Sequence, residues 1–220
     1  FAPLSDANRL RGGAAGASSA GGGLKIVNVA NPLSPITTAA VGPMFARGVA
    51  FHPTLPYVYV AAGTGVNGGL KIVNIANLSL PVIEGTLPPP TNGNSGDIVL
   101  SQDGVYAYIA DYGAGLRVVN ISNPLLPTHV VSVLTTGPAN LVARTGNLLL
   151  VSTVGTGARM HIFDISNPAS PSVLGSFNGN ITAPNPNSLV NPSGIWIDGT
   201  VAYVSGLDVL QAIDISDPTA

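Results

Sequence analysis

A segment of nine residues occurs five times in this chain, and it constrains the fold more than any other feature of the sequence. The first copy, at residues 24–32, reads Leu-Lys-Ile-Val-Asn-Val-Ala-Asn-Pro, and the copies begin at residues 24, 70, 116, 160 and 210. The intervals between them are 46, 46, 44 and 50 residues. A repeat of this length, without the 3.6-residue apolar spacing of helices, is typical of a β-propeller blade of four short strands.

Each interval divides in the same way. We expect a first strand, a hairpin turn, a second strand, a Gly-rich loop, the repeated segment as third strand, and an outer fourth strand. The expected first strands are 49–51, 98–100, 141–143 and 195–197, the second strands are 57–61, 105–110, 148–152 and 201–205, and the fourth strands are 82–87, 129–134 and 172–177. Asp103-Gly104 and Gly146-Asn147 are hairpin signals. The repeated segment is apolar on both faces, which indicates a strand buried between neighbouring sheets.

The repeats do not add up to a complete ring. Four pairs of inner strands and five third strands predict an all-β fold, a β-propeller of four-stranded antiparallel blades. We expect at least five blades in part, with material missing from one or both ends. Residues 1–23 are interpreted as a degenerate or truncated first blade with a Gly-rich loop, and residues 24–220 as the propeller repeats. An unmatched edge would expose unpaired backbone groups. We therefore expect further blades of the same polypeptide, or another protein chain, to cover it.

The repeated segment resembles the LVIVD repeat family. The resemblance is carried by residues 70–77, 116–124 and 160–168, and by Tyr-Ile-Ala-Asp-Tyr-Gly at 108–113, and it extends over about residues 14–218. It implies a β-propeller of bacterial or archaeal secreted or surface-anchored proteins, used as a binding or structural module without one common activity. The Asp of the family pattern is present only as Asp111, and the equivalent positions hold Ala62, Thr153 and Gly206.

Composition excludes several classes of protein. Eight Lys and Arg and a net charge of −2 cannot neutralise many phosphates, so we expect no nucleic-acid partner. The absence of Cys excludes zinc–thiolate sites, disulfides and thiol catalysis. The three His residues share no repeat position, so no transition-metal site is expected. No apolar run reaches the ~18 residues of a membrane span. Only 8% of the residues are charged, and a neutral surface rich in Asn, Thr, Ser and Gly favours a secreted or cell-surface protein.

Candidate binding residues lie in the loops that would surround the central channel. Loops of this kind usually carry the ligand of a propeller. Asp97 and Asn140 precede first strands, and Asp111 and Tyr112 follow a second strand. Asp208 lies near the same end, as do two long inserts, 88–95 and 178–193.

Two further expectations concern structural residues. We expect Trp196, inside a first strand, to pack in the core. The Asn or Asp at the fifth position of every repeat is expected to bond to nearby backbone at the strand end.

No catalytic residue or cofactor is recognisable, which favours a non-enzymatic function. We expect a secreted or cell-surface propeller that acts as a structural or interaction module in protein assembly or adhesion. Two alternatives stay open. One is a Ca²⁺-dependent lactonase-like propeller hydrolase, motivated by Asp97, Asn140 and Asp111. The other is a glycan-binding propeller that uses Tyr112 and the Asn-rich loops.

Overall fold

The structure is a computed structural model, and it describes residues 22–63, 67–91, 93–155, 158–177, 192–206 and 210–219. The strands are β1 (Leu24–Asn28), β2 (Ile36–Val41), β3 (Ala46–Phe51), β4 (Tyr57–Ala62), β5 (Gly69–Asn74), β6 (Val82–Leu87), β7 (Asp97–Leu100), β8 (Tyr106–Ala110), β9 (Leu116–Asn120), β10 (Thr128–Val133), β11 (Ala139–Thr145), β12 (Leu148–Thr153), β13 (Met160–Asp164), β14 (Ser172–Phe177), β15 (Gly194–Asp198), β16 (Val201–Ser205) and β17 (Leu210–Asp214). Within these ranges no helix is long and apolar enough to cross a membrane.

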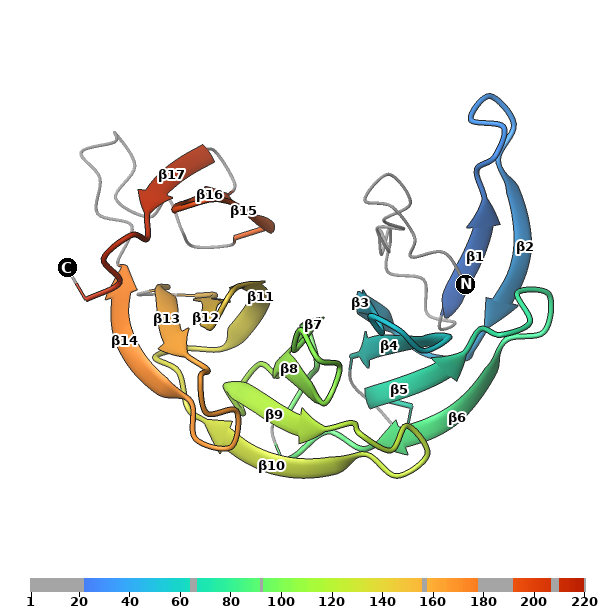
Figure 1. The fold of residues 1–220 in the computed structure, drawn as a ribbon, viewed down its shortest axis with the longest axis horizontal. Helices are drawn as coiled ribbons and strands as arrows, with labels where there is room; N and C mark the ends of the chain where they lie inside the picture. Colours follow the sequence, from blue (N-terminus) through green and yellow to red (C-terminus); the bar gives the residue numbers. More distant parts are fainter. Residues whose placement is uncertain are drawn as a thin grey trace.

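The strands form five antiparallel sheets that follow one another along an open arc (Figure 1). Three sheets have four strands, β3–β6, β7–β10 and β11–β14. In the described residues, the sheet at one end of the arc consists of β1 and β2, and the sheet at the other end consists of β15, β16 and β17. The first strands β3, β7, β11 and β15 lie on the concave side of the arc, and the outer strands lie on its convex side.

The architecture predicted from the repeat is confirmed. Four-stranded antiparallel sheets stand side by side as blades, and the arc does not close into a ring. The repeated segment forms β5, β9, β13 and β17, which are the third strands of their sheets, and it forms β1 in the two-stranded sheet. The prediction missed β2, whose residues are mostly exposed and carry a weak apolar pattern. The interpretation of residues 1–23 as a degenerate blade falls almost entirely outside the described residues and stays a prediction.

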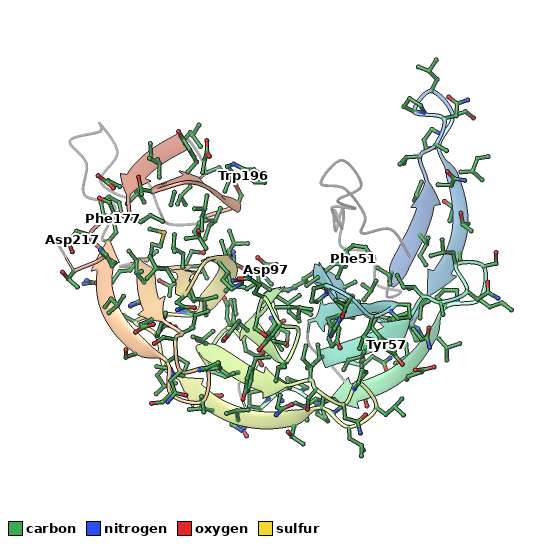
Figure 2. All side chains as sticks on the ribbon, viewed as in Figure 1. Phe51, Tyr57, Asp97, Phe177, Trp196 and Asp217 are labelled. Carbon is green, nitrogen blue, oxygen red and sulfur yellow. The ribbon has the colours of Figure 1, made fainter. Side chains whose placement is uncertain are left out.

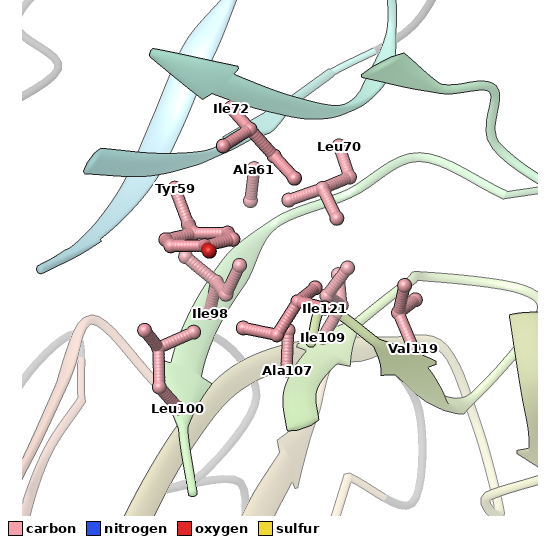
Figure 3. Packing of buried hydrophobic residues seen from close by; sticks show 10 residues of the cluster. All are labelled: Tyr59, Ala61, Leu70, Ile72, Ile98, Leu100, Ala107, Ile109, Val119 and Ile121. Atoms are coloured by element: carbon pink, nitrogen blue, oxygen red, sulfur yellow. The ribbon is translucent and has the colours of Figure 1, made fainter. Parts of the chain in front are cut away.

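Adjacent sheets pack face to face through alternate residues of their strands. In the cluster of Figure 3, Tyr59, Ala61, Leu70 and Ile72 of the β3–β6 sheet meet the next sheet. The residues that face them are Ile98, Leu100, Ala107, Ile109, Val119 and Ile121. Positions one and three of the repeated segment therefore face the following sheet, and position four faces the preceding one. This explains why the central third strands β9 and β13 are buried on both faces.

Polar turns hold the end of each third strand. At the fifth repeat position, the side-chain oxygen accepts a bond of 2.8 or 2.9 Å from the backbone N–H two residues later; these residues are Asn28, Asn74, Asn120, Asp164 and Asp214. The structural role expected for this position is therefore confirmed. The turn that follows packs on the preceding sheet so closely that a Cβ at Gly85 would clash with the carbonyl oxygen of Pro124.

Candidate functional site

The four predicted site residues gather where the β7–β10 sheet meets the β11–β14 sheet. Asp97 begins β7, and Asn140 is the second residue of β11. Tyr112 and Ala139 exchange two backbone hydrogen bonds of 3.0 and 2.9 Å between the two sheets. Asp97 lies on the concave side of the arc (Figure 2). Topology thus brings these residues to one junction, as the repeat alignment predicted.

Two of the four side chains bind the next sheet. Asp97 Oδ2 accepts a 3.2 Å bond from the backbone N–H of Val142, and its Oδ1 accepts one of 2.9 Å from Ile98. Burial raises the pKa of Asp97, and these two N–H donors partly oppose the shift. Asn140 Nδ2 donates a 3.1 Å bond to the carbonyl oxygen of Pro192, which precedes β15. Both residues connect neighbouring blades.

Asp111 forms a buried ion pair that the sequence analysis missed. Its Oδ2 lies 3.4 Å from Nη1 of Arg117, and both side chains are almost fully buried. Ser95, in the insert between β6 and β7, donates a 3.1 Å bond to Asp111 Oδ1. Burial raises the pKa of Asp111 and lowers that of Arg117, while each charge partly offsets the shift of the other. The 88–95 insert therefore helps to cover a structural charge pair.

Tyr112 is the most exposed of the predicted site residues, with 38% of its surface exposed. Its φ of 46° is in the left-handed region, which residues other than Gly rarely adopt. The two bonds to Ala139 hold it there. Among the described residues, no group of three or more His, Cys, Asp or Glu is placed to hold a metal ion. Asp208 and most of the 178–193 insert lie outside the described residues.

A second candidate site is the outward face of the last sheet. Side chains alternate across strands, so one row of this face holds Trp196, Tyr203 and Ala212, which are cross-strand neighbours in the register. Leu210 stands beside this row and is 68% exposed. Trp196 is 49% exposed at the end of the arc (Figure 2). The prediction that Trp196 packs in the core was wrong, because no described sheet lies against this face.

Equivalent positions in the other blades show how unusual this face is. In the three four-stranded sheets the residues at the Leu210 position, which are Leu70, Leu116 and Met160, are 0% exposed, and Leu24 of the first repeat is 8% exposed. Tyr203 is 37% exposed, whereas its equivalents Tyr59, Tyr108 and Leu150 are exposed by at most 1%. In every internal blade these side chains are buried by the following sheet. The last sheet therefore presents one half of an inter-blade interface.

His161, at the second position of its repeat, makes stability depend on pH. Its pKa is lowered by burial and, to a smaller extent, by the charge of Arg159, and its Nε2 accepts a 3.3 Å bond from the N–H of Thr136. The unfolded chain therefore binds this proton at a higher pH, near the ordinary value of 6.5. The stability linked to neutral His161 is present above pH 6.5 and is lost as the pH falls through the folded-state pKa.

We expect His161→Gln to flatten the decline of unfolding free energy between about pH 6.5 and 5, because these limits bracket ordinary His titration and exclude most carboxylates. Urea unfolding over this range measures the effect. His129→Gln, at an exposed position of the outer strand β10, is the control substitution. Identical slopes in all three proteins would contradict the role of His161.

Comparison with known proteins agrees with this architecture. The family model described as LVIVD repeat matches residues 56–87, 92–135, 139–179 and 191–220, which is more than half of the chain. No curated protein matches the sequence.

Several solved structures have a similar fold. A protein of unknown function from Desulfotomaculum acetoxidans matches with a TM-score of 0.64 and 18% identity over 83% of this chain and 57% of its own length. The Myceliophteria thermophila Cps50 (Swd1) β-propeller domain matches with a TM-score of 0.60 and 14% identity, over 89% of this chain and 64% of that one. The periplasmic gluconolactonase of Pseudomonas aeruginosa matches with a TM-score of 0.67 and 12% identity, over 89% of this chain and 64% of that one. The chain thus spans less than two-thirds of each of these proteins, and identities this low establish the fold alone.

Proposed function

Because this chain belongs to the LVIVD-repeat family and its last sheet exposes the side chains that its other blades bury against a neighbour, we propose that it is a non-enzymatic interaction module. The surface that covers the outward face of the β15–β17 sheet is a β-sheet with aliphatic side chains, supplied by another protein chain or by further blades of the same polypeptide. The exposure of Leu210, 68% against 0% at three equivalent positions, carries the proposal.

The internal interfaces define the chemistry of the partner surface. Against Tyr108 and Leu116, the following blade places Val142, Leu149, Val151 and Phe163. Against Leu150 and Met160, it places Ala202, Val204 and Ile213. A partner of the last sheet needs a comparable apolar face. Burial of apolar surface would drive the association, at about 25 cal/mol per Å² before the entropic cost of binding is subtracted.

Cross-linking from the proposed surface tests this function. A photoreactive residue at Leu210, in the full polypeptide produced in its source organism, should give a cross-link to a β-strand of a partner protein or of further blades, identified by mass spectrometry. The same residue at Leu126, which is exposed in the turn between β9 and β10, is the control. A yield at position 210 no higher than at position 126 would contradict the proposal.

Trp196 gives a second readout, because it is the only Trp of the chain. Covering it with a protein partner should shift its emission to shorter wavelength, and Leu210→Ser should weaken the shift. An equal shift on adding soluble oligosaccharides alone would favour the glycan-binding alternative, since aromatic side chains also stack on sugars.

The propeller-hydrolase alternative has less support. Asp97, Asp111 and Asn140, which motivated it, are engaged in bonds to other groups of the protein. Calorimetric titration with Ca²⁺ separates the two functions. Binding at millimolar metal that is lost in Asp97→Asn would favour the hydrolase.

The proposed module acts outside the cell or on its surface. The support is the low charge and the Asn- and Thr-rich composition of the chain. Cell fractionation and surface protease treatment of the source organism test this location, and recovery of the protein only from the cytosol would contradict it.

A further inference from the structure

The turn between β5 and β6 differs from its equivalents at two adjacent positions. In four of the five repeats the turn after the repeated strand begins with Asn or Asp followed by Pro; these pairs are Asn31-Pro32, Asn123-Pro124, Asn167-Pro168 and Asp217-Pro218. In the second repeat Leu78 replaces the Pro and Ser79 follows it, so the turn reads Asn-Leu-Ser. Asn-x-Ser or Asn-x-Thr, in which x is not Pro, is the acceptor sequence for N-linked glycosylation. The two differences therefore create an acceptor sequence that the equivalent turns lack.

The fold of the turn does not require these two residues. Asn77 Oδ1 accepts a 3.0 Å hydrogen bond from the backbone N–H of Ser79. The equivalent bonds in the other four repeats are 3.0 to 3.2 Å long, and their N–H donors are Leu33, Leu125, Ala169 and Thr219. The Asn or Asp side chain thus forms the same turn whether the next residue is Pro or Leu. Formation of the turn does not explain why Leu78 and Ser79 occur here.

The acceptor sequence at Asn77 is accessible in the folded protein. Asn77, Leu78 and Ser79 are all exposed, and the turn lies at the outer rim of the arc (Figure 1). The side-chain oxygen of Asn77 is engaged in the turn. Its Nδ2, the atom that carries the sugar in an N-glycosylated protein, donates no hydrogen bond to any of the described residues. The reacting atom is therefore free at the surface.

A second acceptor sequence, Asn120-Ile121-Ser122, is placed differently. Ile121 is fully buried between two sheets. Asn120 Oδ1 accepts bonds from both the N–H and the hydroxyl group of Ser122, at 2.9 and 2.7 Å. A transferase has to reach all three residues of an acceptor sequence, and the folded chain does not allow this at Asn120. The third such sequence, at Asn180, lies outside the described residues.

We propose that Asn77 is an N-glycosylation site of the folded protein. This inference goes beyond the interaction module and rests on its proposed location outside the cell or on its surface. The turn and the β15–β17 sheet lie at opposite ends of the arc (Figure 1), so a glycan on Asn77 leaves the proposed binding face uncovered. A glycan is bulky and is carried at the surface, which fits the outer rim.

The donor is a sugar activated as a diphosphate ester. Nδ2 of Asn77 forms a bond to the anomeric carbon of the sugar, and the bond from that carbon to the diphosphate oxygen breaks. The diphosphate leaves with the electron pair of the broken bond, and the amide proton passes to a base of the transferase. The protein supplies only the acceptor amide, held by the turn with its oxygen bonded to Ser79.

Peptide mass spectrometry of the protein purified from its source organism tests the site. Trypsin cleaves after Lys71, Arg117, Arg144 and Arg159, and this places the three acceptor sequences in different peptides. We expect the peptide of residues 72–117 to carry a glycan, located on Asn77 by fragmentation, and the peptide of residues 118–144 to be unmodified at Asn120. A peptide 72–117 without a glycan would contradict the proposal.

Two substitutions at one position provide the matched control. Leu78→Pro restores the residue of the other four turns and should abolish the glycan on the peptide of residues 72–117. Leu78→Ala keeps the acceptor sequence and should retain the glycan. Circular dichroism checks that both variants are folded. Ser79→Ala leaves position 78 unchanged and should also abolish the glycan, so the test does not depend on the proline. A glycan that persists in Leu78→Pro and Ser79→Ala would overturn the assignment to Asn77.

The glycosylation site and the proposed function fail separately. The cross-link from position 210 does not depend on a glycan, and the mass of the peptide does not depend on a binding partner. An unmodified Asn77 in protein recovered from the cell surface would overturn the glycosylation site alone. Recovery of unmodified protein from the cytosol only would overturn both the site and the proposed location.

Discussion

Asp111→Ala should lower the free energy of unfolding by about 3–5 kcal/mol, the usual cost of removing one partner of a buried ion pair. Arg117 would stay buried, with only 3% of its side chain accessible, and would lose the carboxylate 3.4 Å from its Nη1. Ser95 would lose the acceptor of its hydroxyl group as well. Denaturant unfolding at pH 7 measures the change.

The double variant Asp111→Ala, Arg117→Met is the first control. With both charges removed, the loss should fall to about 1 kcal/mol or less, because an apolar replacement of a buried pair is often neutral. Lys71→Met is the second control. Lys71 occupies the same repeat position in the neighbouring blade, which has Ala62 in place of the Asp, and burial lowers its pKa. Its removal should cost little. A double variant as unstable as Asp111→Ala would contradict the ion-pair explanation.

The sequence predicted the third strands best, because in the central blades each is apolar on both faces and is repeated. The number of neighbouring sheets explains where the burial of a strand differs from the pattern of the average repeat. In β17 the residues alternate between exposed and buried, since only the preceding sheet packs against it. Trp196 was expected in the core because it belongs to a first strand, and first strands of complete blades are covered by neighbouring sheets. A repeat pattern describes the average blade, and the end of the arc has one neighbour instead of two.

The sequence predicted where the candidate site residues lie in the fold, but not the hydrogen bonds that their side chains make. Alignment of the repeats put Asp97 and Asn140 at the same end of their blades. The N–H group that donates to Asp97 is 45 residues away, and the carbonyl group that accepts from Asn140 is 52 residues away; local patterns cannot predict contacts at such separations. Arg117 left a signal that was overlooked: the blade that retains the family Asp is also the blade with Arg at the second repeat position.

Leu116→Ala and Leu210→Ala should differ sharply in stability, although both change position one of the same repeat. Leu116 is fully buried between two sheets, so its truncation should lower the free energy of unfolding by about 2–5 kcal/mol through lost burial and a cavity. Leu210 is 68% exposed, and a substitution at such a surface position should change stability by no more than about 0.5 kcal/mol. Denaturant unfolding of the two variants beside the wild type gives the comparison.

The contrast between Leu116 and Leu210 also tests whether the outward face of the last sheet is a binding surface. If a partner covers Leu210 as the next blade covers Leu116, then Leu210→Ala should weaken the complex while leaving the isolated protein as stable as the wild type. Burial of an apolar side chain can stabilise a complex only if that side chain is still exposed in the isolated, folded protein. Equal losses in the two isolated variants would mean that the face is covered before any partner arrives, and would remove the observation on which the interaction module rests.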